Sequence, residues 1–171
     1  MSTYNYAGID TYDINNGKGF GVTLFVQGCP HHCNGCHNPE TWDFDGGSPI
    51  DMVVLDKLYK LFNDDNIRRL TFSGGEPFAN IEICVTIARQ FKAFHPEKKI
   101  WIYTGYTLEE LGNIADSGRL LELCDVLVDG PFKIDKTDLS LPFRGSSNQR
   151  IIDMKRTRES GKIILFDMHD V

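Results

Sequence analysis

The sequence lacks the cysteine arrangement of a disulfide-stabilised protein. It has five cysteines among 171 residues, which is an odd number, and three of them lie between Cys29 and Cys36. Disulfide frameworks in small secreted domains use even numbers of well-spaced cysteines. The pattern therefore favours a reducing compartment, and we expect a cytoplasmic protein.

Long apolar runs, a basic excess and internal repeats are also missing. No stretch approaches the ~20 apolar residues of a membrane helix, and the first residues have neither the basic start nor the apolar run of a secretory signal. The formal net charge of −6 disfavours nucleic-acid binding, because such proteins present a basic face. The short basic stretch 155–158 is predicted to be a solvated turn. We expect no membrane and no nucleic acid among the partners.

The bulk composition is that of an ordinary globular chain. With 41% hydrophobic and 25% charged residues, the 171 residues are predicted to form one domain, residues 1–171. The chain is shorter than the roughly 200 residues that a complete eight-fold β/α barrel usually needs. A complete barrel is therefore excluded.

One short loop, residues 29–36, dominates the interpretation; we call it the cluster loop. Cys29, Cys33 and Cys36 have the spacing C-x3-C-x2-C, and no fourth cysteine lies nearby. Three thiolates on one loop suit an iron–sulfur cluster or a zinc ion, each of which normally takes four protein ligands. Three ligands leave one position of the metal centre open, and open positions are where metal centres react.

Zinc is the alternative for this loop. It would be held by the three clustered cysteines and either His32 or His37. Zinc sites usually pair two short-range ligand knuckles, and the sequence has no second one. The other two cysteines, Cys84 and Cys124, fall in apolar helical patterns and are predicted to be core residues.

Strands and helices are predicted to alternate along the chain. Strands are expected at 6–10, 21–27, 69–72, 99–103 and 126–128, and near Ile151 and Ile163; helices are expected from Ser48-Pro49, over 81–95, from Thr107 to a break at Ser117-Gly118, and over 119–124. Such alternation is typical of βαβ units and a mainly parallel sheet. We therefore predict an α/β fold.

A second polar segment follows the strand at 69–72. This glycine loop, Ser73-Gly74-Gly75-Glu76-Pro77, contains two glycines that would allow a ligand to approach the main chain closely. Tyr103, Thr104 and Asp129 stand at the ends of two further strands. Because sites of parallel α/β folds form at the carboxyl ends of strands, we expect these segments to meet there.

Together, the cluster loop and the glycine loop resemble the radical S-adenosylmethionine superfamily. Over residues 20–153, the stretches CPHHCNGCHNPETW, TFSGGEPF, YTGYTLEEL, VDGPF and FRGSSNQRIID resemble the activating proteins of anaerobic ribonucleoside-triphosphate reductase, which are glycyl radical enzyme activases. The resemblance implies a partial β/α barrel. Activases of the pyruvate formate-lyase type look similar but are usually longer, and they remain an alternative.

The resemblance also implies a reaction. Cys29, Cys33 and Cys36 would hold a [4Fe-4S] cluster, and S-adenosyl-L-methionine would chelate its fourth iron. Reductive cleavage of S-adenosylmethionine would then generate a glycyl radical on the reductase, with electrons from a donor such as flavodoxin. No residue beyond the cluster and cofactor is predicted to be catalytic.

The predicted cofactor contacts come from the same resemblance and from position at strand ends. The wider superfamily usually has an aromatic residue where Gly35 stands, so we expect His37 to pack on the adenine instead. The predicted contacts are Gly35, Cys36, His37, Ser73, Gly74, Gly75, Glu76, Tyr103, Thr104 and Asp129.

The partner is predicted to be a protein rather than a small molecule. A partial barrel would leave its mouth open on one side, which suits an inserted polypeptide loop. A non-enzymatic iron–sulfur electron carrier is the alternative from another class. It would need four cysteines per cluster and no glycine loop.

Overall fold

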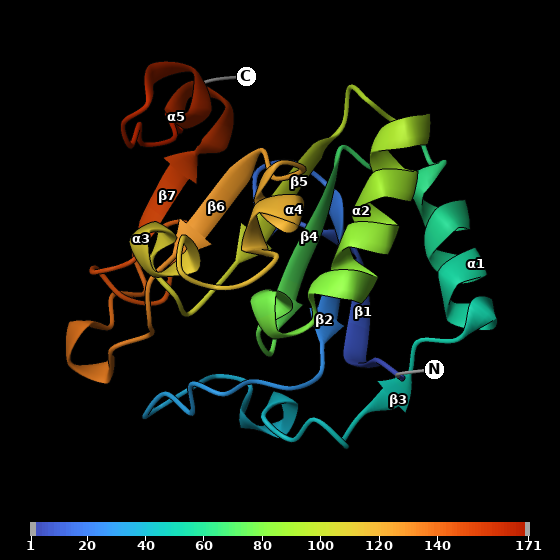
Figure 1. The fold of residues 1–171 in the computed structure, drawn as a ribbon, viewed down its shortest axis with the longest axis horizontal. Helices are drawn as coiled ribbons and strands as arrows, with labels where there is room; N and C mark the ends of the chain where they lie inside the picture. The colour runs from blue at the N-terminus through green and yellow to red at the C-terminus, as the bar shows by residue number, and fades with distance from the viewer. Residues whose placement is uncertain (1–2, 170–171) are drawn as a thin grey trace.

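The computed structural model describes residues 3–169, and its centre is one seven-stranded sheet (Figure 1). The strand order is β3-β1-β2-β4-β5-β6-β7. The central strands run parallel and are β2 (Gly21–Val26), β4 (Arg69–Gly74), β5 (Lys99–Tyr103) and β6 (Val126–Asp129). Antiparallel neighbours extend the sheet on both sides: β1 (Asn5–Asp13), β3 (Ser48–Pro49) and β7 (Arg150–Asp153). The predicted α/β fold with a mainly parallel sheet is confirmed, and the sheet is open, with β3 and β7 at its edges.

Helices cover one face of this sheet. In Figure 1, α1 and α2 lie side by side against it, and α2 also packs on α4. The helices are α1 (Met52–Phe62), α2 (Ile81–Phe94), α3 (Leu108–Leu111), α4 (Ser117–Leu121) and α5 (Met154–Ser160), with short 3₁₀ turns at Pro39–Thr41, Pro77–Ala79 and Ile134–Lys136. No helix among residues 3–169 is long and apolar enough to span a bilayer.

The alternation of side chains along each strand separates two apolar clusters. Leu70 and Phe72 of β4 point to the helical side and join the larger core cluster. Trp101 of β5 belongs to a smaller cluster on the opposite side, with Val128 and Ile151. Residues of both parities thus stabilise the fold, one set against the helices and the other in the smaller cluster on the opposite side.

Two predicted helix boundaries are wrong for local reasons. Ser48-Pro49 does not start a helix but pairs with Tyr6 and Asn5 as edge strand β3, a position where proline is tolerated. The helix starts at Met52 instead, because the Asp51 carboxylate accepts a hydrogen bond from Val54 N at 3.0 Å.

The second boundary error lies after α3. This helix ends at Leu111, and Asp116 adopts a left-handed conformation before α4 begins at Ser117. Ser117-Gly118 therefore starts a helix rather than breaking one. The predicted cap of α3 is confirmed, since Thr107 Oγ1 accepts from Glu110 N at 3.2 Å.

The end of the chain differs from both predictions made for it. The predicted strand near Ile163 is reduced to an isolated bridge between Ile152 and Leu165. The basic stretch 155–158 lies in helix α5, which is capped by the Asp153 side chain through Arg156 N at 3.0 Å. The stretch is therefore a helix rather than the predicted turn, because the Asp153 carboxylate caps it, and it is mostly exposed to solvent as predicted.

Candidate cofactor-binding site

A cavity of ≈ 540 Å³ opens at the carboxyl ends of the parallel strands. In Figure 1 the light-blue chain after β2 and the orange chain before β7 both lie beyond the lower ends of these strands. The second of these, residues 130–149, is called here the closing segment. The cavity is lined by Ile14–Asn16, Cys29, His31, Cys33, Cys36, His37, Asn38, Trp42, Ser73, Gly74, Gly75, Tyr103, Thr104, Gly105, Gly130, Phe132, Leu139, 141–145 and Gln149.

The three cysteines of the cluster loop all line this cavity. Their thiols are free and partly exposed. The loop is folded tightly by left-handed residues: Gly28 (φ 107), His32 (φ 49) and Gly35 (φ 76). Burial, with a smaller contribution from the nearby Glu76 carboxylate, raises the pKa of the Cys29 thiol, although backbone hydrogen bonds at His31 and His32 oppose the shift.

The arrangement of the possible ligands bears on the choice between an iron–sulfur cluster and zinc. Within residues 3–169, no three His, Cys, Asp or Glu side chains converge closely enough to ligate one metal ion. The rings of His32 and His37 are packed against Trp42 and Phe132, respectively. Thiolates that each bind a different iron need not converge on one point, and so the three cysteines can serve as ligands of a [4Fe-4S] cluster.

The remaining two cysteines are core residues, as predicted. Cys84 and Cys124 are fully buried in the larger apolar cluster. Burial strongly raises the pKa of both thiols. The Cys124 thiol is also directed to the carbonyl of Val126, at 3.2 Å.

The two glycines of the glycine loop are required by the neighbouring chain. A Cβ on Gly74 would lie 2.5 Å from the carbonyl oxygen of Val26, and one on Gly75 would lie 2.6 Å from that of Gly28. The main chains are joined by hydrogen bonds from Gly75 N to Val26 O (3.1 Å) and from Glu76 N to Gly28 O (2.9 Å). The glycines were predicted for ligand approach, but they first allow the glycine loop to lie directly against the start of the cluster loop.

Glu76 is the polar centre of this junction. Its side chain is fully buried. One carboxylate oxygen, Oε1, accepts from His31 Nε2 (2.7 Å), Thr104 Oγ1 (2.8 Å) and Gly105 N (2.8 Å). The other oxygen accepts from Phe78 N at 3.0 Å. Glu76 therefore connects the cluster loop, the glycine loop and the end of β5, and it does so from behind the cavity wall.

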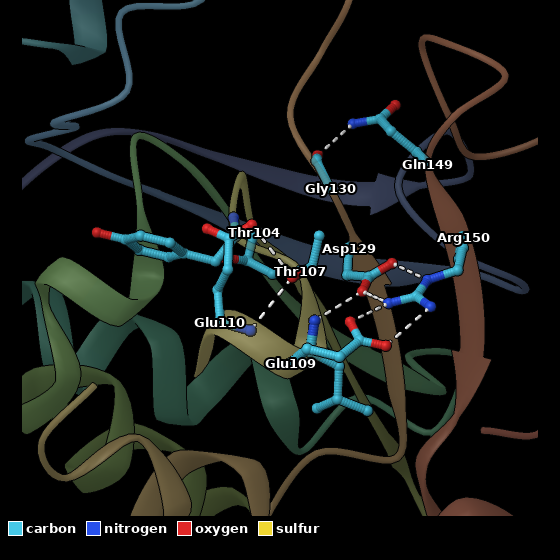
Figure 2. A network of polar contacts seen from close by, with 10 residues as sticks. Thr104, Thr107, Glu109, Glu110, Asp129, Gly130, Gln149 and Arg150 are labelled. Atoms are coloured by element: carbon cyan, nitrogen blue, oxygen red, sulfur yellow. Dashed lines mark hydrogen bonds and ion pairs between the residues drawn. The ribbon is translucent and has the colours of Figure 1, made fainter. Parts of the chain in front are cut away.

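Tyr103 and Asp129 show how strand parity sorts the predicted residues. Tyr103 lines the cavity, its hydroxyl donates to Phe143 O at 2.8 Å, and burial raises its pKa. Tyr103 pairs with Val128 in the sheet, so the next residue, Asp129, points to the opposite, helical side. There its carboxylate binds Arg150 at 2.5 Å and accepts from Leu108 N at 2.8 Å (Figure 2).

The predicted contacts therefore divide into two groups. Cys36, His37, Ser73, Gly74, Gly75, Tyr103 and Thr104 line the cavity. Gly35, Glu76 and Asp129 are not among its lining residues; Gly35 lies against Ile134, since a Cβ there would lie 2.6 Å from the Ile134 side chain. A direct cofactor contact by these three residues stays a prediction that the lining of the cavity does not favour.

The sequence did not reveal how much of the cavity wall comes from the closing segment. Phe143, Arg144 and Gln149 line the cavity, and a Cβ on Gly145 would lie 3.6 Å from the His37 ring. Among the described residues, Arg144 is the only Lys or Arg in the lining, and no Asp or Glu lines the cavity. The stretch FRGSSNQ contained the signal, but arginine in a polar loop cannot be placed without the tertiary fold.

Two buried polar atoms at this cavity also have no partner among residues 3–169. They are the Nε1 of Trp42 and the Nε of Arg144. Both residues line the cavity. Unpaired buried donors are costly in a folded protein, so their place beside three thiols fits a site that receives anionic acceptors.

Comparison with known proteins agrees with this chemistry. Residues 15–152 match the family model described as 4Fe-4S single cluster domain. The chain is 40% identical over 151 residues to the "Anaerobic ribonucleoside-triphosphate reductase-activating protein" of Pasteurella multocida (strain Pm70), covering 86% of this chain and 96% of the relative. The protein of the same name from Escherichia coli (strain K12) is 41% identical over 149 residues, with 85% and 96% covered. The one from Enterobacteria phage T4 is 36% identical over 149 residues, with 86% and 92% covered. Because the matches span most of every chain, this chain belongs to the 4Fe-4S single cluster domain family and, within it, to the anaerobic ribonucleoside-triphosphate reductase-activating proteins.

Proposed function

We propose that the protein activates an anaerobic ribonucleoside-triphosphate reductase as a radical S-adenosylmethionine enzyme. The observation that carries the proposal is the meeting of three free cysteines and a glycine loop at one cavity. The names of the relatives support the protein substrate. The open sheet with its site at the carboxyl ends of parallel strands supports a partial β/α barrel of the radical S-adenosylmethionine type.

The residues of the cluster loop would hold the cluster. Cys29, Cys33 and Cys36 would each bind one iron, leaving the fourth for S-adenosylmethionine. When bound, the reduced [4Fe-4S] cluster supplies the electron that cleaves S-adenosylmethionine, and the outcome is a glycyl radical on the reductase. A one-electron donor such as flavodoxin would reduce the cluster. The chain itself would bind and orient the cofactor and exclude water from the site.

Arg144 is the side chain best suited to the carboxylate of S-adenosylmethionine. It is the one guanidinium in a lining without carboxylates, and only its Nη1 has a main-chain acceptor, Gln149 O at 2.9 Å. The Arg144 charge contributes to lowering the pKa of Asp138, but Asp138 is not part of the lining. A guanidinium binds carboxylates in bidentate geometry, which would orient the methionine part of the cofactor.

The exposed main chain of the glycine loop would complete the cofactor site. Ser73, Gly74 and Gly75 line the cavity next to the thiols. Tyr103 and Thr104 form the adjoining wall, and His37 with Phe132 forms an aromatic pair at 5.0 Å between centroids that suits the adenine. Exposed Leu139 and Ile14 lie at the cavity and suit the apolar part of a protein partner.

The test uses protein reconstituted with iron and sulfide without oxygen. With a reductant, S-adenosylmethionine and the reductase, we expect cleavage to methionine and a glycine-centred doublet by electron paramagnetic resonance. Cys33→Ala should lose cluster iron, whereas Cys84→Ala should keep it, because Cys84 is buried in the core. A cluster that transfers electrons without cleaving S-adenosylmethionine would instead indicate an electron carrier.

A further inference from the structure

His31 is held by the protein on three sides, although it belongs to the cluster loop. Its Nε2 is 2.7 Å from Glu76 Oε1, and its side chain is 17% exposed. The ring meets Tyr106 edge-on, with 4.4 Å between centroids. A Cβ on Gly105 would lie 2.5 Å from the ring, so that the glycine leaves the space in which the ring lies.

The neighbouring histidine provides the contrast. His32 is exposed, and its ring stacks on Trp42 at 4.6 Å with an interplanar angle of 11°. Among the hydrogen bonds of the described residues, none joins the His32 ring to the glycine loop or to the end of β5. The two adjacent histidines thus have opposite settings on the same short loop.

The chemistry of the His31–Glu76 contact is directional. A carboxylate only accepts hydrogen bonds, so Nε2 of His31 donates, as do the Thr104 hydroxyl and Gly105 N–H on the same oxygen. Thr104 and Gly105 directly follow β5, a parallel strand beside β4. Glu76 is therefore held in place by residues next to the sheet. Through its hydrogen bond to Glu76, His31 restrains the loop between Cys29 and Cys33.

We infer that His31 is a positioning residue that ties the cluster loop to Glu76 and so sets the place of Cys29 and Cys33 before any cofactor binds. Only the role of His31 in cofactor binding rests on the proposed function, because the hydrogen bond between His31 and Glu76 is present in the protein without a cofactor. Its loss should loosen the loop even in protein without a cluster. It should also make a bound cluster easier to extract and weaken S-adenosylmethionine binding.

The experiment compares two conservative variants with a matched control. In His31→Gln the amide nitrogen reaches as far as Nε2 and can donate to Glu76, whereas the shorter side chain of His31→Asn cannot. His32→Asn is the control from the adjacent, untied position. All three lie outside the apolar core clusters, and thermal unfolding by circular dichroism confirms that each variant is folded.

The first readout is amide hydrogen exchange of residues 29–36 in the cluster-free protein. A hydrogen bond to a charged group is strong enough that His31→Asn should speed exchange by about tenfold. His31→Gln and His32→Asn should stay within about twofold of the wild type, because the tie to Glu76 is kept. Equal exchange in His31→Asn and His31→Gln, or an equal increase in His32→Asn, would overturn the inference.

The second readout uses reconstituted protein and needs no turnover. His31→Asn should release iron to a chelator about tenfold faster than the wild type and bind S-adenosylmethionine more weakly by calorimetry, with His31→Gln restoring both. Unchanged iron release in a variant with loosened exchange would contradict the inference while leaving the proposed function intact. Failure of the wild type to hold iron would instead refute the proposed function and leave the exchange result valid.

Discussion

Glu76 and Asp129 are two buried carboxylates at the ends of parallel strands, and they hold different parts of the structure together. Each is at most 1% exposed and stands at the carboxyl end of a parallel strand. Glu76 accepts from His31, Thr104 and two main-chain amides and connects the loops around the cavity. Asp129 binds Arg150, which also binds Glu109, and fixes the start of α3 (Figure 2). The difference teaches that the end of a strand alone does not place a side chain in the site.

A third buried carboxylate, Asp13, gives the reference for a purely structural role. It accepts from Thr23 Oγ1 at 2.5 Å and pairs with Arg69 at 3.4 Å, and both partners of the pair are nearly inaccessible. Neither residue is among those lining the cavity. Substitutions at these three carboxylates therefore distinguish effects on the free energy of unfolding from effects on cofactor affinity.

The largest loss of stability is expected for Asp13→Asn. The Arg69 side chain, which is 0% exposed, would keep its charge without a counter-ion. Breaking a buried ion pair on one side costs about 3–5 kcal/mol. Urea unfolding measures the loss. A decrease in stability of less than about 1 kcal/mol would mean that the pair is weak.

The same residue predicts a pH dependence. Burial raises the pKa of Asp13, but hydrogen bonds from Thr23, Asn15 and Asn16 and the Arg69 charge outweigh it, so that the pKa is lowered. A lowered pKa adds stability above the unfolded value of about 3.9, and this is lost as the pH falls through the folded value. Below about pH 4, unfolding free energy should fall more steeply in the wild type than in Asp13→Asn. Parallel curves would contradict the prediction.

Glu76→Gln should reduce both stability and cofactor binding. The amide oxygen can replace Oε1, but the amide nitrogen then faces the buried N–H of Phe78, a donor against a donor. An unsatisfied buried group costs about 1–3 kcal/mol. Because Glu76 holds the loops around the cavity, S-adenosylmethionine should bind at least about tenfold more weakly.

Calorimetry and urea unfolding test Glu76→Gln together. Glu82→Gln, on the exposed surface of α2, is the matched control. Unchanged cofactor affinity in Glu76→Gln would place Glu76 beside Asp129 as a residue of the scaffold alone.

Asp129→Asn should lower stability without changing cofactor binding. It weakens a charged hydrogen-bond network, at a cost of about 1.5 kcal/mol, because Arg150 keeps Glu109 and contact with water. S-adenosylmethionine affinity should stay within about twofold, since the side chain is directed to the helical side. Loss of affinity with unchanged stability would restore the cofactor contact predicted from the sequence.

The smallest effect is expected for Glu109→Gln. The hydrogen bond from Arg150 lowers the pKa of Glu109, but its side chain is 61% exposed. Exposed ion pairs contribute about 0.2–1 kcal/mol and are screened by salt. Unfolding at low and high ionic strength checks this. A salt-independent loss larger than about 1 kcal/mol would mean that the network acts as one unit around Asp129.

The sequence by itself determined the chemistry and the class of fold. Cys29, Cys33 and Cys36 belong to one loop whatever the tertiary structure, and alternating apolar strands and helices are local patterns. The capping box at Thr107 was also readable, because the interaction spans only three residues. The family motifs were visible for the same reason.

Two helix ends were mispredicted because the same residues carry competing local signals that only the neighbouring strands resolve. Ser48-Pro49 reads as a helix start, yet pairing with β1 draws both residues into the sheet. Asp51 and Asp153 then cap the helices that follow. A capping side chain therefore fixes where a helix starts only among the residues that do not pair in a neighbouring strand.

Only the tertiary structure decided which of the predicted site residues meet at the cavity. The period-two alternation along β5 and β6, combined with their register, places Tyr103 at the cavity and Asp129 behind the sheet. The link between His31 and Glu76 joins residues that are 45 positions apart. Arg144 reaches the cavity because the closing segment lies against His37. Such contacts depend on register and on long-range packing, which no local pattern in the sequence specifies.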